Sequence, residues 1–196
     1  MLTSTYLNEI LARYTGATRL LPKGTASSGL TAEEIALIHA AGFPAHVPLT
    51  SWTRVDTARY GQLRDVAVTL SPDEFAGTAR ACFEHGDASE QTSWCRAVSI
   101  LPQPEQYLQL VVDACRTNIL PLFESIACDN PYPAAFFPER NFNQLVLKAM
   151  FNGIALARIV GLDRRRNAEL SRMATDYAAE RTAAGRTVPA DIALAQ

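Results

Sequence analysis

Helix-starting signals recur along this chain of 196 residues, and strand signals do not. Thr31 and Ser71 each stand three residues before a glutamate, which is the pattern of a capping box at the start of an α-helix. Apolar residues then follow at spacings of three and four, the periodicity of a helix with one buried face. Alternating β-branched residues, which mark strands, are not sustained anywhere. The sequence therefore predicts an all-α fold.

The predicted helices cover most of the chain and are joined by short loops. Short connections place consecutive helices antiparallel, so helical pairs stacked in an α–α superhelix of the HEAT-like type are one expected architecture. A compact helical bundle is the alternative. We expect a single domain over residues 1–196, with helices at about 3–15, 31–42, 52–69, 71–86, 87–101, 104–118, 121–129, 139–152, 154–160, 167–183 and 188–194.

A net charge of -2 at pH 7 gives no electrostatic reason to expect a nucleic-acid binder. Residues 138–196 nevertheless carry 9 basic and 6 acidic side chains, against 9 basic and 14 acidic in residues 1–137. A basic face would attract an anionic metabolite or an acidic protein, and an ordinary mixed surface is the alternative. The short run Arg164-Arg165-Arg166 is interpreted as a solvated loop.

No apolar run reaches the ~20 residues that a membrane span needs, so we expect no transmembrane segment. The N-terminal sequence MLTSTYLNEI lacks a cationic start followed by an apolar block, so we expect no signal peptide and a cytoplasmic protein. The cysteines have no C-x-x-C spacing and are interpreted as buried free thiols; they are Cys82, Cys95, Cys115 and Cys128.

Motifs for metal and nucleotide chemistry are missing from the sequence. The three histidines, His39, His46 and His85, fall in different segments without E-x-x-H or H-E-x-x-H spacing. The sequence has neither a glycine-rich phosphate loop nor a G-x-S-x-G nucleophile motif. We therefore expect no metal and no cofactor.

The helix predicted over residues 139–152 carries a narrow polar stripe. Gln144 and Lys148 share this stripe with Asn141 and Asn152, and the rest of the circumference is apolar. A lysine among amides is a plausible anion-binding set. A solvated helix face, with a lysine that reaches the surface, is the alternative interpretation.

Asn143 falls in the apolar sector of the same helix, where an unsatisfied amide costs about 1–3 kcal/mol. It therefore needs a nearby partner, and the rigid turn Asn130-Pro131-Tyr132-Pro133 is expected to supply a backbone group. This bond would bring Tyr132 close to Lys148. A cation and a phenol on facing walls would suit an anionic or aromatic small molecule.

Two further groups of polar residues are candidates for binding. Arg116, Asn118 and Glu124 flank a predicted helix corner, where capping and an Arg–Glu pair would also explain them. Arg181 continues the apolar stripe of the long helix predicted near the C-terminus. An arginine in that position is expected to pair with a carboxylate, either Asp163 or Glu124.

The second half of the chain contains a series of distinctive motifs. They are Arg116-Thr117-Asn118, Phe123-Glu124-Ser125-Ile126-Ala127, Asn130-Pro131-Tyr132-Pro133, Asn143-Gln144-Leu145-Val146-Leu147-Lys148-Ala149, Ile159-Val160-Gly161-Leu162-Asp163-Arg164-Arg165 and the tail Asp176-Tyr177-Ala178-Ala179-Glu180-Arg181 with Ala184-Gly185-Arg186. These motifs resemble the EboA family of metabolite traffic proteins and occur in the family's order over about residues 100–190, whereas the first hundred residues share little beyond helical character. Ala179 departs from the family pattern, in which we expect a histidine before Glu-Arg.

The resemblance implies a bacterial protein encoded with a UbiA-type prenyltransferase in an operon attached to secondary-metabolite clusters. Such operons are associated with the export of metabolite precursors. We expect a non-enzymatic helical adaptor or small-molecule-binding protein, whose partners are an anionic or aromatic metabolite and other proteins of the operon. The alternatives are an enzyme that acts on a phosphorylated or carboxylated intermediate, and a purely structural helical-repeat scaffold.

The candidate ligand-binding residues come from these motifs and from the polar stripe. They are Arg116, Asn118, Glu124, Asn130, Tyr132, Asn143, Gln144, Lys148, Asp163 and Arg181.

Overall fold

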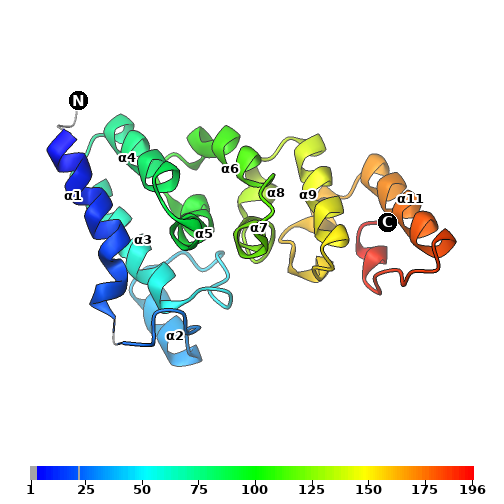
Figure 1. Cartoon of the computed structure of the whole chain (residues 1–196), viewed down its shortest axis with the longest axis horizontal. Helices are drawn as coiled ribbons and strands as arrows, with labels where there is room; N and C mark the ends of the chain where they lie inside the picture. The colour runs from blue at the N-terminus through cyan, green and yellow to red at the C-terminus, as the bar shows by residue number, and fades with distance from the viewer. Residues whose placement is uncertain (1–3, 22) are drawn as a thin grey trace. The chain divides into compact units, whose positions relative to one another are not determined.

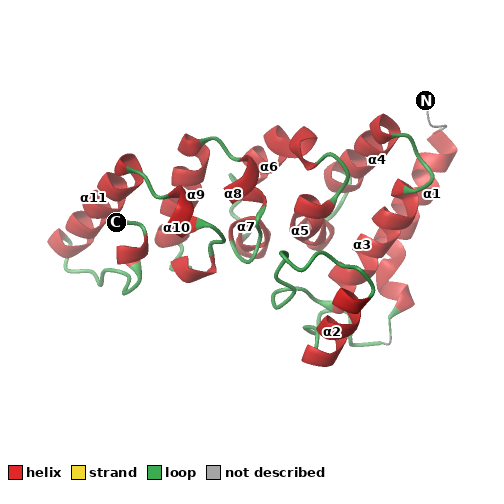
Figure 2. Cartoon of the chain, turned by 180° about the vertical axis from the view of Figure 1, so that it is seen from behind, coloured by secondary structure: helices red, strands yellow, loops and turns green. Residues whose placement is uncertain are grey.

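The computed structural model describes residues 4–21 and 23–196, and it consists of helices joined by loops (Figures 1 and 2). The structure is 67% helical, with eleven α-helices and no strand among the described residues. One isolated bridge pairs Gly29 with Thr53. The predicted all-α class is confirmed. The choice between a superhelix and a bundle stays a prediction.

The chain divides into two compact units, Met1–Ile126 and Ala127–Gln196. The expected single domain therefore stays a prediction. The helices of the first unit are α1 (Ser4–Thr15), η1 (Gly16–Leu20), α2 (Ala32–Ala40), α3 (Arg54–Ala67), α4 (Pro72–Glu84), α5 (Ala88–Ala97), η2 (Val98–Ile100), η3 (Pro104–Tyr107), α6 (Leu108–Ala114) and α7 (Leu120–Ala127), which ends at the boundary. The second unit holds α8 (Tyr132–Phe136), α9 (Glu139–Phe151), η4 (Leu156–Arg158), α10 (Leu162–Arg165), α11 (Ala168–Ala183) and η5 (Ile192–Leu194).

Capping boxes start helices in the first unit, as the sequence predicts. The hydroxyl of Thr31 accepts from the Glu34 N–H at 3.2 Å, and the Glu34 carboxylate accepts from the Thr31 N–H at 2.8 Å. Ser71 donates to the Glu74 carboxylate from its backbone N–H and from its hydroxyl, at 3.3 and 2.7 Å. Asp87 forms the equivalent box at the start of α5. Each box satisfies backbone groups that a helix end otherwise leaves unpaired.

The core of the first unit forms where α3 packs against α1 and α5 (Figure 1). The Tyr14 hydroxyl donates to the carbonyl oxygen of Glu90 at 2.8 Å, and burial raises the pKa of Tyr14 well above its usual value. The indole N–H of Trp94 donates to the carbonyl of Ala79 at 2.8 Å. The Tyr14 hydroxyl and the Trp94 indole N–H thus each keep a hydrogen-bond acceptor when they are buried, which offsets the loss of their hydrogen bonds to water.

Charged side chains are buried beside this aromatic core. Asp56 is 2% exposed, and its carboxylate accepts from the Ser93 hydroxyl and from Arg96, each at 2.6 Å. The same carboxylate caps α3 by accepting from the N–H and hydroxyl of Thr53, both at 2.7 Å. Arg59, which is 3% exposed, donates to Ser93 at 2.9 Å. Four donors thus converge on one buried carboxylate, which is the condition under which a buried charge is tolerated.

Several predicted helices are shorter in the structure, because proline, glycine or 3₁₀ geometry interrupts them. The helix expected over 104–118 divides into η3 and α6, and it ends at Ala114. The helices expected at 154–160 and 188–194 are reduced to η4 and η5, of three residues each. The first predicted helix matches α1, and its expected first residue, at position 3, lies outside the described residues.

The proline-rich segment that we expected as a turn begins a short helix instead. Pro131 stands at the N-cap of α8, and the Asn130 side-chain oxygen accepts from the backbone N–H of Tyr132 at 2.9 Å. Proline is compatible with a helix start because the first N–H groups of a helix have no intrahelical acceptor. The segment is therefore the start of a helix and not an isolated turn.

Arg165 corrects the prediction of a solvated loop at Arg164-Arg165-Arg166. It lies on α10 and donates to the carbonyl oxygens of Ala134 and Phe137, both at 2.7 Å. Its guanidinium also lies 4.7 Å from the centre of the Phe142 ring. Gly161, at the start of α10, allows α10 to lie this close to Ala134. Its φ is +75°, and a Cβ at this position would lie 2.8 Å from the Ala134 methyl group.

All four cysteines are outside disulfide bonds, as predicted, and Cys82, Cys95 and Cys128 are buried. Cys115 is only half-buried, which corrects its predicted burial. Burial raises the pKa of Cys82 to about 12, so its reactive thiolate form is scarce at neutral pH. No helix in the described ranges has the length and apolar character that a membrane crossing requires.

Candidate functional site

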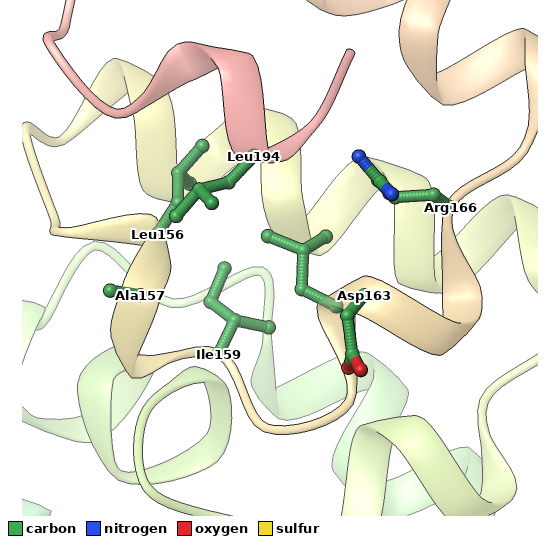
Figure 3. Close-up of a pocket in the computed structure, with 7 residues that line it drawn as sticks. Leu156, Ala157, Ile159, Asp163, Arg166 and Leu194 are labelled. Carbon is green, nitrogen blue, oxygen red and sulfur yellow. The ribbon is translucent and has the colours of Figure 1, made fainter.

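A cavity of about 330 Å³ lies in the second unit, between η4, α10 and η5 (Figure 3). Its wall is mainly apolar. Leu156 is 0% exposed, and Ile159 and Leu162 are each 4% exposed. These side chains form the floor of the cavity and are held in place by the residues packed around them. Leu194 is 43% exposed and closes one side. The remaining lining residues are Ala157, Asp163 and Arg166.

The apolar wall follows from local backbone geometry. Leu156, Ile159 and Leu162 are spaced by three residues, and a 3₁₀ turn aligns side chains at i and i+3 on one side. The N–H of Ile159 donates to the carbonyl of Leu156 at 3.0 Å, and the N–H of Leu162 donates to that of Ile159 at 3.3 Å. The first of these turns is 3₁₀, and the second is a β-turn with Gly161 in the left-handed region at φ +75°. The three branched side chains all line the cavity.

Two polar contacts hold η4 in place around the cavity. The carboxylate of Asp191 accepts from the backbone N–H of Leu156 at 2.6 Å. Arg158 pairs with Asp129, with 2.8 Å between Nη2 and Oδ2, and the Asp129 N–H donates to the Arg158 carbonyl, also at 2.8 Å. Bonds to charged groups are about twice as strong as neutral ones, so they position the short helix firmly.

Asp163 and Arg166 supply the charged rim. Both are exposed, and neither has an ion-pair partner within 4.0 Å among the described residues. In Figure 3 the Arg166 side chain extends toward the side on which Leu194 lies, whereas the Asp163 carboxylate points away from Leu194. An apolar wall beside an available guanidinium suits a ligand with an apolar body and a negative end.

Tyr132 and Lys148, which we expected on facing walls, differ in exposure. Tyr132 is fully buried, with its ring centre 4.8 Å from that of Phe136 and 6.2 Å from that of Phe137. Lys148 is half-buried on α9, and Gln144 is exposed on the same helix. Tyr132 is thus a core residue, and a ligand site that it shares with Lys148 stays a prediction.

Asn143 is buried, as its position in the apolar sector indicates, but its expected partner was wrong. Its side chain forms a reciprocal amide pair with Asn167, in which the two N···O distances are 3.1 and 3.0 Å. The Asn167 oxygen also accepts from the Leu170 N–H at 2.9 Å and so caps α11. The pair joins α9 to the start of α11, not to the segment that contains Asn130.

Arg181 donates from Nε to the carbonyl oxygen of Thr187 at 2.9 Å, and its guanidinium lies 5.8 Å from the centre of the Tyr177 ring. The predicted pairing of Arg181 with Asp163 or Glu124 was therefore wrong. A carbonyl oxygen and an aromatic face take the place of the expected carboxylate.

The candidate residues near the end of the first unit are arranged around a surface corner. Arg116 pairs with Asp113 at 2.7 Å, and the Arg116 side chain is 75% exposed. The alternative explanation, in which Arg116 pairs with Glu124, does not hold, because Arg116 pairs with Asp113. Asn118 is exposed, and Glu124 is half-buried on α7. Exposed ion pairs of this kind contribute little to stability.

Of the predicted set, Asp163 lies at the cavity. Sequence reasoning missed Arg166, which we assigned to a solvated loop, and the apolar residues Leu156 and Leu194. The spacing of Leu156, Ile159 and Leu162 was the available signal, although a helix with one buried face gives a similar pattern. No group of three or more potential metal ligands (His, Cys, Asp or Glu) is found among the residues that the structure describes.

The fold and the cavity define an all-α protein with a small, mainly apolar pocket and a charged rim. A family model described as "Metabolite traffic protein EboA" matches residues 9–195, and the chain belongs to the EboA family. This match extends the resemblance that we found over about residues 100–190 to the first hundred residues. Neither the curated proteins nor the solved structures include a match to the chain.

Proposed function

We propose that this EboA-family protein is a non-enzymatic binding protein for an amphipathic, negatively charged small molecule. The observation that carries the proposal is the cavity beside η4, in which an apolar wall meets the Arg166 guanidinium. Its volume of about 330 Å³ falls in the range of small-molecule sites, which is roughly 300–1,000 Å³.

The apolar part of the ligand would lie against Leu194, which is 43% exposed, above the tightly packed side chains of Leu156, Ile159 and Leu162. Removal of apolar surface from water contributes about 25 cal/mol per Å². Arg166 would orient the ligand, because a guanidinium forms paired hydrogen bonds with a carboxylate or a phosphate. Most of the lining side chains are aliphatic and have no group that transfers a proton, which favours binding over catalysis.

Within the metabolite traffic family, we propose that the ligand is a secondary-metabolite precursor, and that the protein carries it in the cytoplasm. Its protein partners would be the other products of an operon that contains a UbiA-type prenyltransferase. The family membership supports a role in metabolite traffic, and the cavity supports a direct contact with the metabolite.

The proposal is tested by identifying small molecules that co-purify with the protein. Ala157 is an exposed lining residue, so Ala157→Trp should fill the cavity without disturbing the core. Ala193→Trp is a matched control, because Ala193 is exposed on η5 and is not a lining residue of the cavity. Mass spectrometry of extracts should find an anionic molecule with the wild type and with Ala193→Trp, at a level at least tenfold lower with Ala157→Trp. Equal recovery from all three proteins would contradict the proposal.

A further inference from the structure

A second pocket of the C-terminal unit has a different composition. It is an open trough of about 640 Å³ lined by the end of α9, one face of α11 and the segment 187–191. It shares no lining residue with the cavity beside η4. The residues that give it chemical character are Phe151, Tyr177, Arg181 and Asp191. We refer to it below as the aromatic trough.

An exposed aromatic ring forms one wall of the aromatic trough. Phe151 is 60% exposed at the last position of α9, although phenylalanine is among the residues most often buried. Its ring lies 4.8 Å from the ring of Tyr177 at an interplanar angle of 78°. Tyr177 is 5% exposed, and its hydroxyl donates to the Met150 carbonyl at 3.3 Å. Phe151 is therefore held against a fixed partner while much of its surface stays available for stacking.

A positively charged side chain stands beside this ring pair. The Nε of Arg181 donates to the Thr187 carbonyl at 2.9 Å, and the guanidinium lies 5.8 Å from the Tyr177 ring centre. These contacts orient the guanidinium. Its two terminal nitrogens make no hydrogen bond or ion pair with any residue in the described part of the chain. Arg181 is half-buried, so an acceptor that reached these nitrogens would meet a partly desolvated cation.

Asp191 lines the same trough without neutralising Arg181. One oxygen of its carboxylate is occupied by the Leu156 N–H at 2.6 Å, and no ion pair forms between Asp191 and Arg181 within 4.0 Å. A ligand in the trough is thus attracted by one positive charge and repelled by one negative charge at another position. This arrangement favours a ligand with one negative charge over a ligand with two. A second negative charge on the ligand would find no second cation and would be repelled by the Asp191 carboxylate.

We propose that the aromatic trough is a second ligand site, specific for aromatic monocarboxylates. The carboxylate of the ligand would accept from the terminal nitrogens of Arg181, and its ring would stack on Phe151. The bidentate geometry of a guanidinium matches a carboxylate, and aromatic pairs gain stability beyond the area that they bury. This site is separate from the cavity in which we propose that the amphipathic metabolite binds.

The probe is 2-naphthoate, titrated into the full-length protein by isothermal calorimetry. In the Ala157→Trp background, in which the first cavity is filled, we expect saturable binding with one site per chain, and at least tenfold weaker binding of the neutral isostere 2-naphthamide. Arg181→Gln should weaken 2-naphthoate binding at least tenfold, and Arg181→Lys should recover part of it, because the charge remains and the fork is lost. Phe151→Ala should weaken the binding of both compounds about fivefold, as the loss of one stacking contact of about 1 kcal/mol predicts.

Controls separate this site from general effects and from the first cavity. Arg172→Gln removes an exposed arginine of α11 that already pairs with Glu169 and Asp176, and it should change affinity less than twofold. Binding of 2-naphthoate in the aromatic trough should persist in Ala157→Trp, so failure of one proposed site does not decide the other. Phenyl phosphate, a dianion above pH 6–7, should bind at least fivefold more weakly than 2-naphthoate. Absence of saturable binding would overturn the proposal, as would loss of binding in Ala157→Trp or retained affinity in a folded Arg181→Gln variant.

Discussion

Asp191 accepts a hydrogen bond from the backbone N–H of Leu156 at 2.6 Å, across 35 residues of sequence. Leu156 lines the cavity beside η4, and Asp191 lines the aromatic trough. One contact therefore fixes a wall residue of each pocket. It also attaches the segment before η5 to η4, which has only three residues and little intrinsic stability.

Loss of this contact should loosen η4 and both pockets. Asp191→Ala leaves the Leu156 N–H without its charged acceptor, so we expect a loss of about 1.5–3 kcal/mol from the local opening free energy. Asp191→Asn keeps an acceptor oxygen and should cost about half as much. Amide hydrogen exchange of Leu156, measured by NMR, reports this opening directly. Unchanged protection of Leu156 in Asp191→Ala would show that the contact does not hold η4.

The amide pair of Asn143 and Asn167 should behave as one energetic unit. Asn143→Leu should destabilise the protein by about 1–3 kcal/mol, because it leaves the Asn167 amide without its buried partner. A double-mutant cycle with Asn167→Ala should give a coupling of about 0.5–3 kcal/mol. Urea unfolding is best followed by far-UV circular dichroism, since both tryptophans, Trp52 and Trp94, lie in the first unit. Strictly additive effects would contradict the pairing.

The buried carboxylate of Asp56 should matter more to stability than any surface ion pair. Asp56→Asn leaves the half-buried Arg96 facing a neutral amide, so we expect a loss of about 3 kcal/mol, the lower end for breaking a buried pair. Tryptophan fluorescence during urea unfolding reports the first unit, which contains Asp56. The matched control is Glu169→Gln on the exposed pair with Arg172, which should cost at most about 1 kcal/mol. Similar losses in the two variants would mean that the Asp56 network is not a stabilising core element.

Glu34 should give the stability of the first unit a dependence on acid pH. Hydrogen bonds from Arg54 and Thr31 lower the pKa of its carboxyl from 4.5 to about 2. Because the folded-state pKa is depressed, the stabilisation is fully present above about pH 4.5 and is lost as the pH falls toward 2. A carboxyl-carbon NMR titration should show Glu34 titrating well below the unpaired glutamates, and Arg54→Met should move its midpoint back toward 4.5. A wild-type midpoint near 4.5 would contradict these contacts.

The starts of helices were predictable because their signals are local. A capping box at Thr31 or Ser71 needs only residues three positions apart, and these residues form the same contacts in the structure. The burial of Asn143 was equally visible from its place on one helix. Its partner was not, because Asn167 lies 24 residues away and meets it only after α9 and α11 have packed.

The partners of the charged residues around the pockets were equally difficult to predict from the sequence. Arg165 and Arg166 are neighbours in a run that looks like a solvated loop, yet one binds two backbone carbonyls and the other borders a cavity. Their roles differ because Arg165 is the last residue of α10, whereas Arg166 is its C-cap, where the backbone has left the helix with φ -57° and ψ 140°. Arg181 was expected to meet a carboxylate, whereas the fold supplies the Thr187 carbonyl and leaves two nitrogens available. Such partners depend on tertiary contacts that no local pattern encodes.

Ligand binding in the cavity beside η4 is tested directly by calorimetric titration with octanoate, an apolar chain that ends in a carboxylate. We expect saturable binding to the wild type and no binding to Ala157→Trp. We also expect about tenfold weaker binding to Arg166→Gln, because one exposed hydrogen-bonded charge contact is lost. The neutral analogue 1-octanol should bind wild type and Arg166→Gln equally. If octanoate binds Arg166→Gln and Ala157→Trp as tightly as the wild type, the cavity beside η4 is not the binding site.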